Sequence, residues 1–174
     1  MNERHRSEIE PRLFRHVMGR FASGVTVITA QNGDEVRGMT ASAFMSGSLE
    51  PPLCVVAVAK RAHMHTVLTQ SDRFGVNVLA EDQEMLSIHF AGRRVPGLSP
   101  EFDYLDRVPL LPDGCARMVA EIVARHDCGD HTLFIGHILH MEADGSRPPL
   151  AYHAGRYAGL VYKEDEEGSI PEFW

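Results

Sequence analysis

Hydrophobic residues near the start of the chain recur at helical spacing. Leu13, Val17 and Phe21 follow one another at intervals of four residues, which places their side chains on one side of an α-helix. Ser7 is suited to cap the start of this helix. The pattern predicts an amphipathic helix over residues 9–21.

Most later apolar segments are short and rich in β-branched or aromatic residues, which is typical of strands. The dipeptide Asn32-Gly33 is a turn signal and predicts a hairpin between the first two strands. The segment 53–59 is apolar throughout, so we expect a strand buried on both faces. The expected strands cover residues 25–30, 35–40, 53–59, 74–79, 115–125, 132–141 and 156–162, and short helices are expected over 63–69 and 82–90.

This succession of short strands with few helices predicts a mainly β fold, built as an antiparallel barrel. No GxGxxG motif follows a strand, which argues against a Rossmann fold. Residues 93–112 contain four prolines and predict a long surface loop, of the kind that often covers a site. The length of 174 residues suits one domain, which we assign to residues 1–162, followed by an acidic linker and short tail over 163–174.

Composition and charge exclude several classes of protein. The formal net charge of −7 argues against binding to nucleic acid, because phosphate contacts need a basic face. The longest apolar run, 53–59, is too short to span a bilayer, and the N-terminus lacks the apolar core of a secretory signal. We therefore expect a cytoplasmic protein that binds neither nucleic acid nor membrane.

Cysteine and histidine usage gives no sign of a metal centre or a disulfide framework. The three cysteines are an odd number without a CxxC pair, and Cys54 lies in an apolar run as a small buried residue would. His126, Cys128 and His131 carry metal-binding side chains, but no fourth ligand follows at a familiar zinc spacing and HExxH is missing. The sequence predicts no metal site.

The segment 38–48, GMTASAFMSGS, leaves a strand and runs through small and hydroxyl-bearing residues. Small side chains let a backbone approach a flat ligand, and free N–H groups and hydroxyls can bond a ring edge that carries several acceptors. A flavin has such an edge, and reduction puts negative charge on it. The alternative is a polar loop of turn residues without a ligand, and the residues alone favour it.

Two further segments carry groups suited to a nucleotide. Lys60 and Arg61 precede the expected helix over 63–69, and two cations at a helix start form a plausible phosphate site; surface charges at a solvated strand end are the alternative. The turn Gly129-Asp130 brings His131 to the start of a strand. Residues 152–157, YHAGRY, suit stacking and anion binding, as a nicotinamide dinucleotide requires, although taken alone they favour a β-turn.

Taken together, these segments resemble the short-chain flavin reductase family with the FMN-binding split-barrel fold. This family includes the reductase partners of two-component flavin monooxygenases. The similarity runs from about Phe14 to Leu160. Its motifs are, in the family's order, MGRFASGVTV over 18–27, GMTASAFMSGS over 38–48 followed by PPL over 51–53, FAG over 90–92, GDHT over 129–132 and YHAGRY over 152–157.

The resemblance implies an NAD(P)H:flavin oxidoreductase that transfers hydride from NADH or NADPH to FMN or FAD and supplies reduced flavin to a partner monooxygenase. It also implies a homodimer with flavin near the subunit interface. The alternative is a non-catalytic flavin-binding or electron-carrying protein on the same fold. The presence of His131 and of residues 152–157 favours the enzyme, because a carrier needs no nicotinamide site.

The resemblance also assigns roles to individual residues. His131 would approach the nicotinamide and act as the catalytic residue. Ala62 and Met64 stand where the family often has hydroxyl residues, so phosphate binding would depend more on the two preceding cations and on backbone N–H groups. The implied flavin-binding residues are Met39, Thr40, Ala41, Ser42, Ser46, Ser48, Lys60, Arg61, Phe90, Ala91 and Gly92, and the implied NAD(P)H-binding residues are His131, His153, Arg156 and Tyr157.

Overall fold

The computed structural model describes residues 9–162. The predicted Ser7 cap and the linker and tail over 163–174 lie outside the described residues. The described part consists mainly of antiparallel strands with three α-helices, so the predicted mainly β architecture is confirmed. The helices are α1 (Pro11–Met18), α2 (His63–Gln70) and α3 (Glu84–Phe90), the last preceded by a 3₁₀ turn, η1 (Glu81–Gln83).

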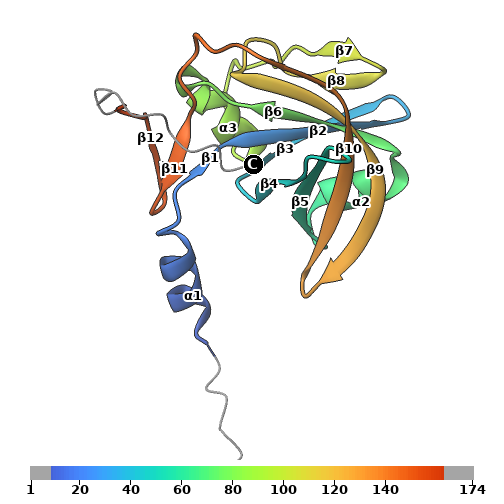
Figure 1. Cartoon of the computed structure of the whole chain (residues 1–174). Helices are drawn as coiled ribbons and strands as arrows, with labels where there is room; N and C mark the ends of the chain where they lie inside the picture. Colours follow the sequence, from blue (N-terminus) through green and yellow to red (C-terminus); the bar gives the residue numbers. More distant parts are fainter. Residues whose placement is uncertain (1–8, 163–174) are drawn as a thin grey trace, which may run out of the picture.

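Seven strands form the main sheet, in the order β3-β2-β6-β9-β10-β5-β4 (Figure 1). The hairpin predicted at Asn32-Gly33 joins β2 to β3, with Gly33 in the left-handed region at φ 60°. A smaller sheet contains β1 (Ser23–Gly24), β11 (Ala151–His153) and β12 (Arg156–Ala158). The strands of the main sheet are β2 (Thr26–Asn32), β3 (Glu35–Ala41), β4 (Phe44–Ser48), β5 (Leu53–Ala59), β6 (Arg73–Val78), β9 (Ala116–Cys128) and β10 (His131–Ala143).

The two edge strands of the main sheet are neighbours in the sequence. β3 ends at Ala41 and β4 begins at Phe44, so only Ser42 and Ala43 connect them. A sheet whose first and last strands are joined by two residues has to curl until its edges approach each other. Among the described residues β3 pairs only with β2, and β4 only with β5. The curled sheet is therefore open between β3 and β4, and we call this opening the seam.

The inner face of the curled sheet is filled by apolar side chains. Phe74 and Phe134 are fully buried there, and α2 adds Met64 and Leu68 to the same cluster. Cys54 is buried in it, as predicted, and burial raises the pKa of its thiol to about 11. This packing holds one face of α2 against the inner core, with the start of the helix next to the end of β5.

A second cluster lies on the outer face. Val27, Leu79 and Leu150 are buried in it, and Phe90 of α3 and Tyr157 of β12 pack against it. Removing apolar side chains such as these from water is the main contribution that holds surface elements on a sheet. α3 and β12 are thereby held on the outer side of the sheet, with α3 against β2 and β3.

The strand β5 is not buried on both faces, and the prediction was wrong on this point. Cys54, Val56 and Val58 are buried, whereas the residues that alternate with them are only partly buried. β5 belongs to an antiparallel sheet, in which one face packs on the core and the other stays partly solvated.

The segment 93–112 is not simply a surface loop, contrary to the prediction. Its second half forms a hairpin of β7 (Asp103–Leu105) and β8 (Val108–Leu110). Val108 and Leu110 are buried against Val119 of β9. The prolines suggested a loop, but the apolar residues between them cover the outer face of the sheet.

The last predicted strand, 156–162, is also different in the structure. The chain forms two short strands, β11 and β12, joined by a tight turn at Ala154 and Gly155, both of which have positive φ. The turn favoured by the sequence over 152–157 is therefore present. β11 and β12 therefore form one hairpin, and their side chains lie next to one another.

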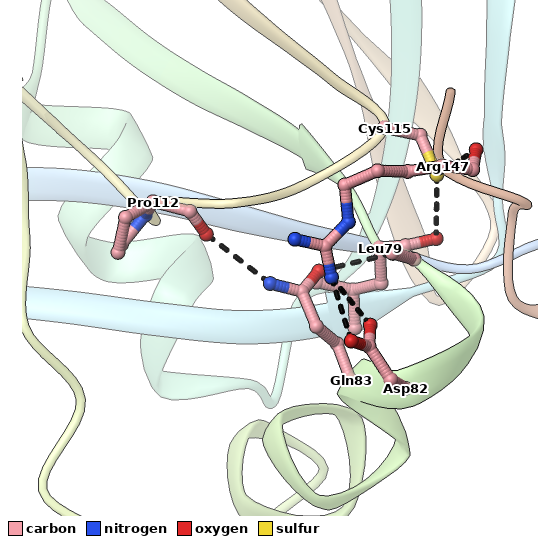
Figure 2. A network of polar contacts seen from close by, with 7 residues as sticks. Leu79, Asp82, Gln83, Pro112, Cys115 and Arg147 are labelled. Atoms are coloured by element: carbon pink, nitrogen blue, oxygen red, sulfur yellow. Dashed lines mark hydrogen bonds and ion pairs between the residues drawn. The ribbon is translucent and has the colours of Figure 1, made fainter. Parts of the chain in front are cut away.

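A cluster of polar contacts joins three connecting segments at the end of the sheet where the second cluster lies (Figure 2). Arg147 forms a bidentate ion pair with Asp82 at 2.6 and 2.8 Å. The Gln83 side chain accepts the Ala80 N–H and donates to the Pro112 carbonyl. The Cys115 sulfur lies 3.5 Å from the Leu79 carbonyl and 3.3 Å from the Arg147 carbonyl, so its thiol can donate to either of them. These contacts anchor the connection that leads into β11 and β12.

The helix α1 is shorter than predicted and begins with Pro11 in its first turn. It has no buried residue and projects away from the sheet (Figure 1). Its end is tied to the β11–β12 turn by the Ala154 N–H, which donates to the Gly19 carbonyl at 2.8 Å. Among residues 9–162, no helix has the length and apolar character needed to cross a membrane.

Candidate functional site

The segment 38–48 is not a loop, although the sequence suggested one. It contains the end of β3, the two connecting residues Ser42 and Ala43, and β4. The Ala43 carbonyl accepts a hydrogen bond from the Ala57 N–H at 3.0 Å. Ser42 and Ala43 are exposed at the seam, and their small side chains permit a sharp corner between the two edge strands.

The end of β3 presents different residues to its two faces. Met39 and Ala41 face the inner core. Gly38 and Thr40 face α3 on the outer side. A Cβ atom at Gly38 would lie 2.5 Å from the ring of Phe90, so only glycine allows this ring to pack on the strand. Two of the implied flavin-binding residues, Thr40 of β3 and Phe90 of α3, therefore lie where β3 and α3 pack together.

A chain of hydrogen bonds runs outward from Thr40. Its hydroxyl donates to the Ser87 carbonyl at 2.6 Å, and the Ser87 hydroxyl contacts the Tyr157 hydroxyl at 2.8 Å. The Tyr157 ring also meets Tyr152 edge-on at 5.3 Å. β3, α3 and the β11–β12 hairpin are therefore linked by specific polar contacts as well as by apolar packing.

On the other side of the seam, Ser46 and Ser48 lie on β4. Ser46 is exposed and Ser48 partly buried, and the pairing of β4 with β5 shifts register between them. A strand that pairs on one side only has N–H and C=O groups available on the other. β3 and β4 both have such edges, so the seam offers backbone donors and acceptors to a flat ligand.

Lys60 and Arg61 follow β5 directly and lie beside the β9–β10 turn. The Lys60 N–H donates to the Asp130 carbonyl at 2.9 Å, and its ammonium group forms an ion pair with Asp127 at 3.2 Å. Within residues 9–162, Arg61 forms no ion pair. The structure therefore brings the two predicted phosphate-binding cations next to His131, which pairs with Ala59 across β5 and β10.

His131 is held by its neighbour in the turn. Its Nδ1 lies 2.8 Å from the Asp130 carboxylate, and this hydrogen bond holds the pKa of Asp130 below its ordinary value. An acceptor at Nδ1 favours the tautomer with the proton there, which leaves Nε2 as an acceptor in the neutral ring. The side chain is about two-fifths exposed, so the ring is open to solvent on part of its surface.

The predicted NAD(P)H-binding residues do not form one group within the chain. His153 and Arg156 are exposed on the β11–β12 hairpin, and Tyr157 is half-buried there. The tip of the β9–β10 hairpin, where His131 lies, is well separated from β12 (Figure 1). Ala91 and Gly92 are exposed at the end of α3, and Gly92 has a φ of 93°.

The structure adds three residues that the sequence did not single out for the site. Ser87 connects Thr40 to Tyr157, Asp127 pairs with Lys60, and His65 contacts the Thr132 hydroxyl at 2.9 Å beside His131. Ser87 precedes Phe90 by three residues, so helical spacing placed both on one face of α3. The other two contacts join distant segments, for which the sequence contains no local signal.

In the part of the chain that the structure describes, no three His, Cys, Asp or Glu side chains are grouped so that they could hold a metal ion. His126 and His131 lie on neighbouring strands of the β9–β10 hairpin, and Cys128 is opposite His131. The prediction that the protein needs no metal is not tested by this arrangement.

Comparison with known proteins identifies the family. The model of the flavin reductase like domain matches residues 18–161. The chain is 39% identical over 156 residues to an NADH-dependent flavin reductase from Rhodococcus sp, with 88% of each chain covered. It is 41% identical over 149 residues to the reductase component of 4-hydroxyphenylacetate 3-monooxygenase from Thermus thermophilus, covering 86% of this chain and 96% of the relative.

A solved structure has the same fold. Flavin reductase PheA2 in its native state superposes with a TM-score of 0.85 at 40% identity, covering 88% of this chain and all of the other. The predicted fold and the predicted flavin reductase activity are thereby confirmed, and the chain belongs to the flavin reductase like domain family.

Proposed function

We propose that this protein uses NADH to reduce a flavin that binds along the seam, and that it passes the reduced flavin to a monooxygenase. The observation that carries the proposal is the seam itself. It is bordered by the edges of β3 and β4, which pair with no other strand among the described residues, and Lys60 and Arg61 lie at the end of β5, the neighbour of β4. The names of the Rhodococcus and Thermus relatives support NADH as the donor and a monooxygenase as the recipient.

The residues of the seam suit a flavin. Backbone groups near Ser42 and Ala43 would bond the polar edge of the ring. Ala57, which bonds Ala43, precedes Lys60 by three residues, or about 10 Å of extended chain. The ribityl chain of FMN or FAD spans a distance of this order, so the phosphate would lie near Lys60 and Arg61. The Lys60 ammonium group would then contact both the Asp127 carboxylate and the phosphate.

The flavin supplies the hydride-accepting ring, and the chain has to orient it and stabilise the negative charge that develops. Fixed backbone N–H groups at the seam suit this task because they need no rearrangement during the reaction. No strong general base is required. His131, held by Asp130, would use Nε2 to accept a hydrogen bond from the nicotinamide carboxamide.

We further propose that the enzyme is a homodimer in which α1 packs on a second copy. Its apolar side chains are more than half exposed within one chain. The tip of the β9–β10 hairpin, where β10 begins at His131, is well separated from β12, which contains Tyr157 (Figure 1). A nicotinamide site that contains both residues would therefore need one of them from each subunit. The side chains of α1 that would enter this interface are Leu13, Phe14, Val17 and Met18.

One experiment tests the proposed reaction. Purified protein is mixed anaerobically with NADH or NADPH, in the presence of FMN, FAD or no added flavin, and nucleotide oxidation is followed. We expect rapid oxidation of NADH that depends on added flavin. Oxidation of neither nucleotide with either flavin would contradict the proposal. Analytical ultracentrifugation of the same sample tests the dimer.

A further inference from the structure

Ser87 is a fully buried hydroxyl among apolar neighbours. It lies in the middle of α3, and none of its surface is exposed. Its side chain cannot touch a ligand, yet a buried hydroxyl is retained at a cost unless a partner satisfies it. Here the partner is the Tyr157 hydroxyl at 2.8 Å.

Two different atoms of Ser87 make its contacts with β12 and β3. The side-chain hydroxyl bonds Tyr157 on β12, while the main-chain carbonyl accepts the Thr40 hydroxyl of β3 at 2.6 Å. The same carbonyl also accepts the Ala91 N–H of its own helix. One buried residue thus connects the strand that borders the seam to the tyrosine assigned to the nicotinamide.

We propose that Ser87 is a positioning residue that fixes the phenol of Tyr157 relative to the flavin strand β3. Among residues 9–162, the phenol is otherwise restrained by apolar packing and by the edge of Tyr152, neither of which defines the place of its hydroxyl. With Ser87 in place, the face of the β11–β12 hairpin that carries Tyr157 has one orientation relative to β3 of its own chain. The inference rests on the proposed role of Tyr157 at the NADH site.

The separation of the two contacts allows a selective test. Ser87→Ala removes the bond to Tyr157 and keeps the carbonyl that serves Thr40, and alanine is favourable in a helix, so the variant should fold. Tyr157→Phe removes the same bond from its other end. At saturating flavin, each variant should raise the KM for NADH by about three- to tenfold, with a smaller change in kcat and in flavin affinity. Because both changes delete one interaction, the double variant should resemble either single variant.

Ser71→Ala is the matched control. Ser71 is also a buried serine, and its hydroxyl donates to the Val67 carbonyl at 2.8 Å at the far end of α2. It should lower the melting temperature without changing the KM for NADH.

Two results would overturn the inference. Ser87→Ala with reduced stability and an unchanged KM, or additive effects in the double variant, would leave Ser87 a purely structural residue. An unchanged KM in Tyr157→Ala would remove Tyr157 from the NADH site and the inference with it. Failure of the wild-type protein to oxidise NADH would instead contradict the proposed function.

Discussion

The inner core of the sheet and the helix α1 contain the same kinds of side chain in opposite situations. Phe134 has no exposed surface, whereas Phe14 of α1 is 55% exposed. The core is complete within one chain, while α1 and the seam leave apolar or hydrogen-bonding groups without a partner from the described part of the same chain. The core maintains the fold, whereas α1 and the seam are available to a second copy of the chain or to a ligand.

The largest loss of stability should follow a substitution in the inner core. Phe134→Ala should reduce the free energy of unfolding by about 3–5 kcal/mol, because it leaves a cavity that a close-packed interior cannot fill. Phe14→Ala is the matched control, and its smaller cost should depend on protein concentration, since that ring would be buried only between chains. Urea unfolding at two protein concentrations measures both. If both variants lost the same free energy of unfolding at both protein concentrations, the distinction between the core and α1 would be contradicted.

Two charges on α1 should dissociate the proposed dimer without unfolding the sheet. Replacing Leu13 and Val17 by glutamate would remove two apolar side chains from the interface, at about 1.5–3 kcal/mol each. Sedimentation should then give the mass of a single chain with an unchanged circular dichroism spectrum. Val123→Glu, at an exposed position on β9, is the control and should leave the mass unchanged. A dimer that persists in the α1 variant would assign the interface to another surface.

The third prediction addresses the ligand-binding surface. His131→Ala should lower kcat/KM for NADH about ten- to a hundredfold, or roughly 1–3 kcal/mol, with little change in flavin affinity. His140→Ala is the control, because His140 also pairs with an aspartate, Asp106 at 3.1 Å, but lies away from the seam. Stopped-flow reduction of flavin by NADH measures the effect. Unchanged reduction by a folded His131→Ala protein would remove this residue from the site.

The smallest effect concerns pH. The His131 ring lowers the pKa of Asp130, so the ionised carboxylate is favoured in the folded state. The resulting stabilisation is present above the carboxyl's ordinary pKa of about 4 and is lost as the pH falls below it. Asp130 is exposed, so the effect on stability is small. Carboxyl NMR titration should show the Asp130 pKa rising towards its ordinary value in His131→Ala, and an unchanged pKa would contradict the hydrogen bond.

The sequence predicted most of the secondary structure where the pattern was local. The β2–β3 hairpin was found because a turn dipeptide is a property of two adjacent residues. The helix at the start of the chain was found, at greater length than α1 has, because helical spacing is also a local property. The hairpin of β7 and β8 was missed, since its residues Val108 and Leu110 are buried only by contact with β9, and the prolines beside them indicated a loop. The two-sided burial predicted for β5 failed for the same reason, because burial depends on what covers the strand.

The sequence by itself determined which residues are suited to bind a nucleotide, because small residues, cations and a histidine beside an aspartate are chemical facts of the chain. It also determined the family, through motifs in a fixed order. The tertiary structure alone decided that the segment 38–48 forms parts of two edge strands bordering a seam, and that Lys60 and Arg61 lie beside His131. It alone decided that Ser87 joins Thr40 to Tyr157. Contacts between distant segments follow from the curling and packing of the whole sheet, and no local pattern encodes them.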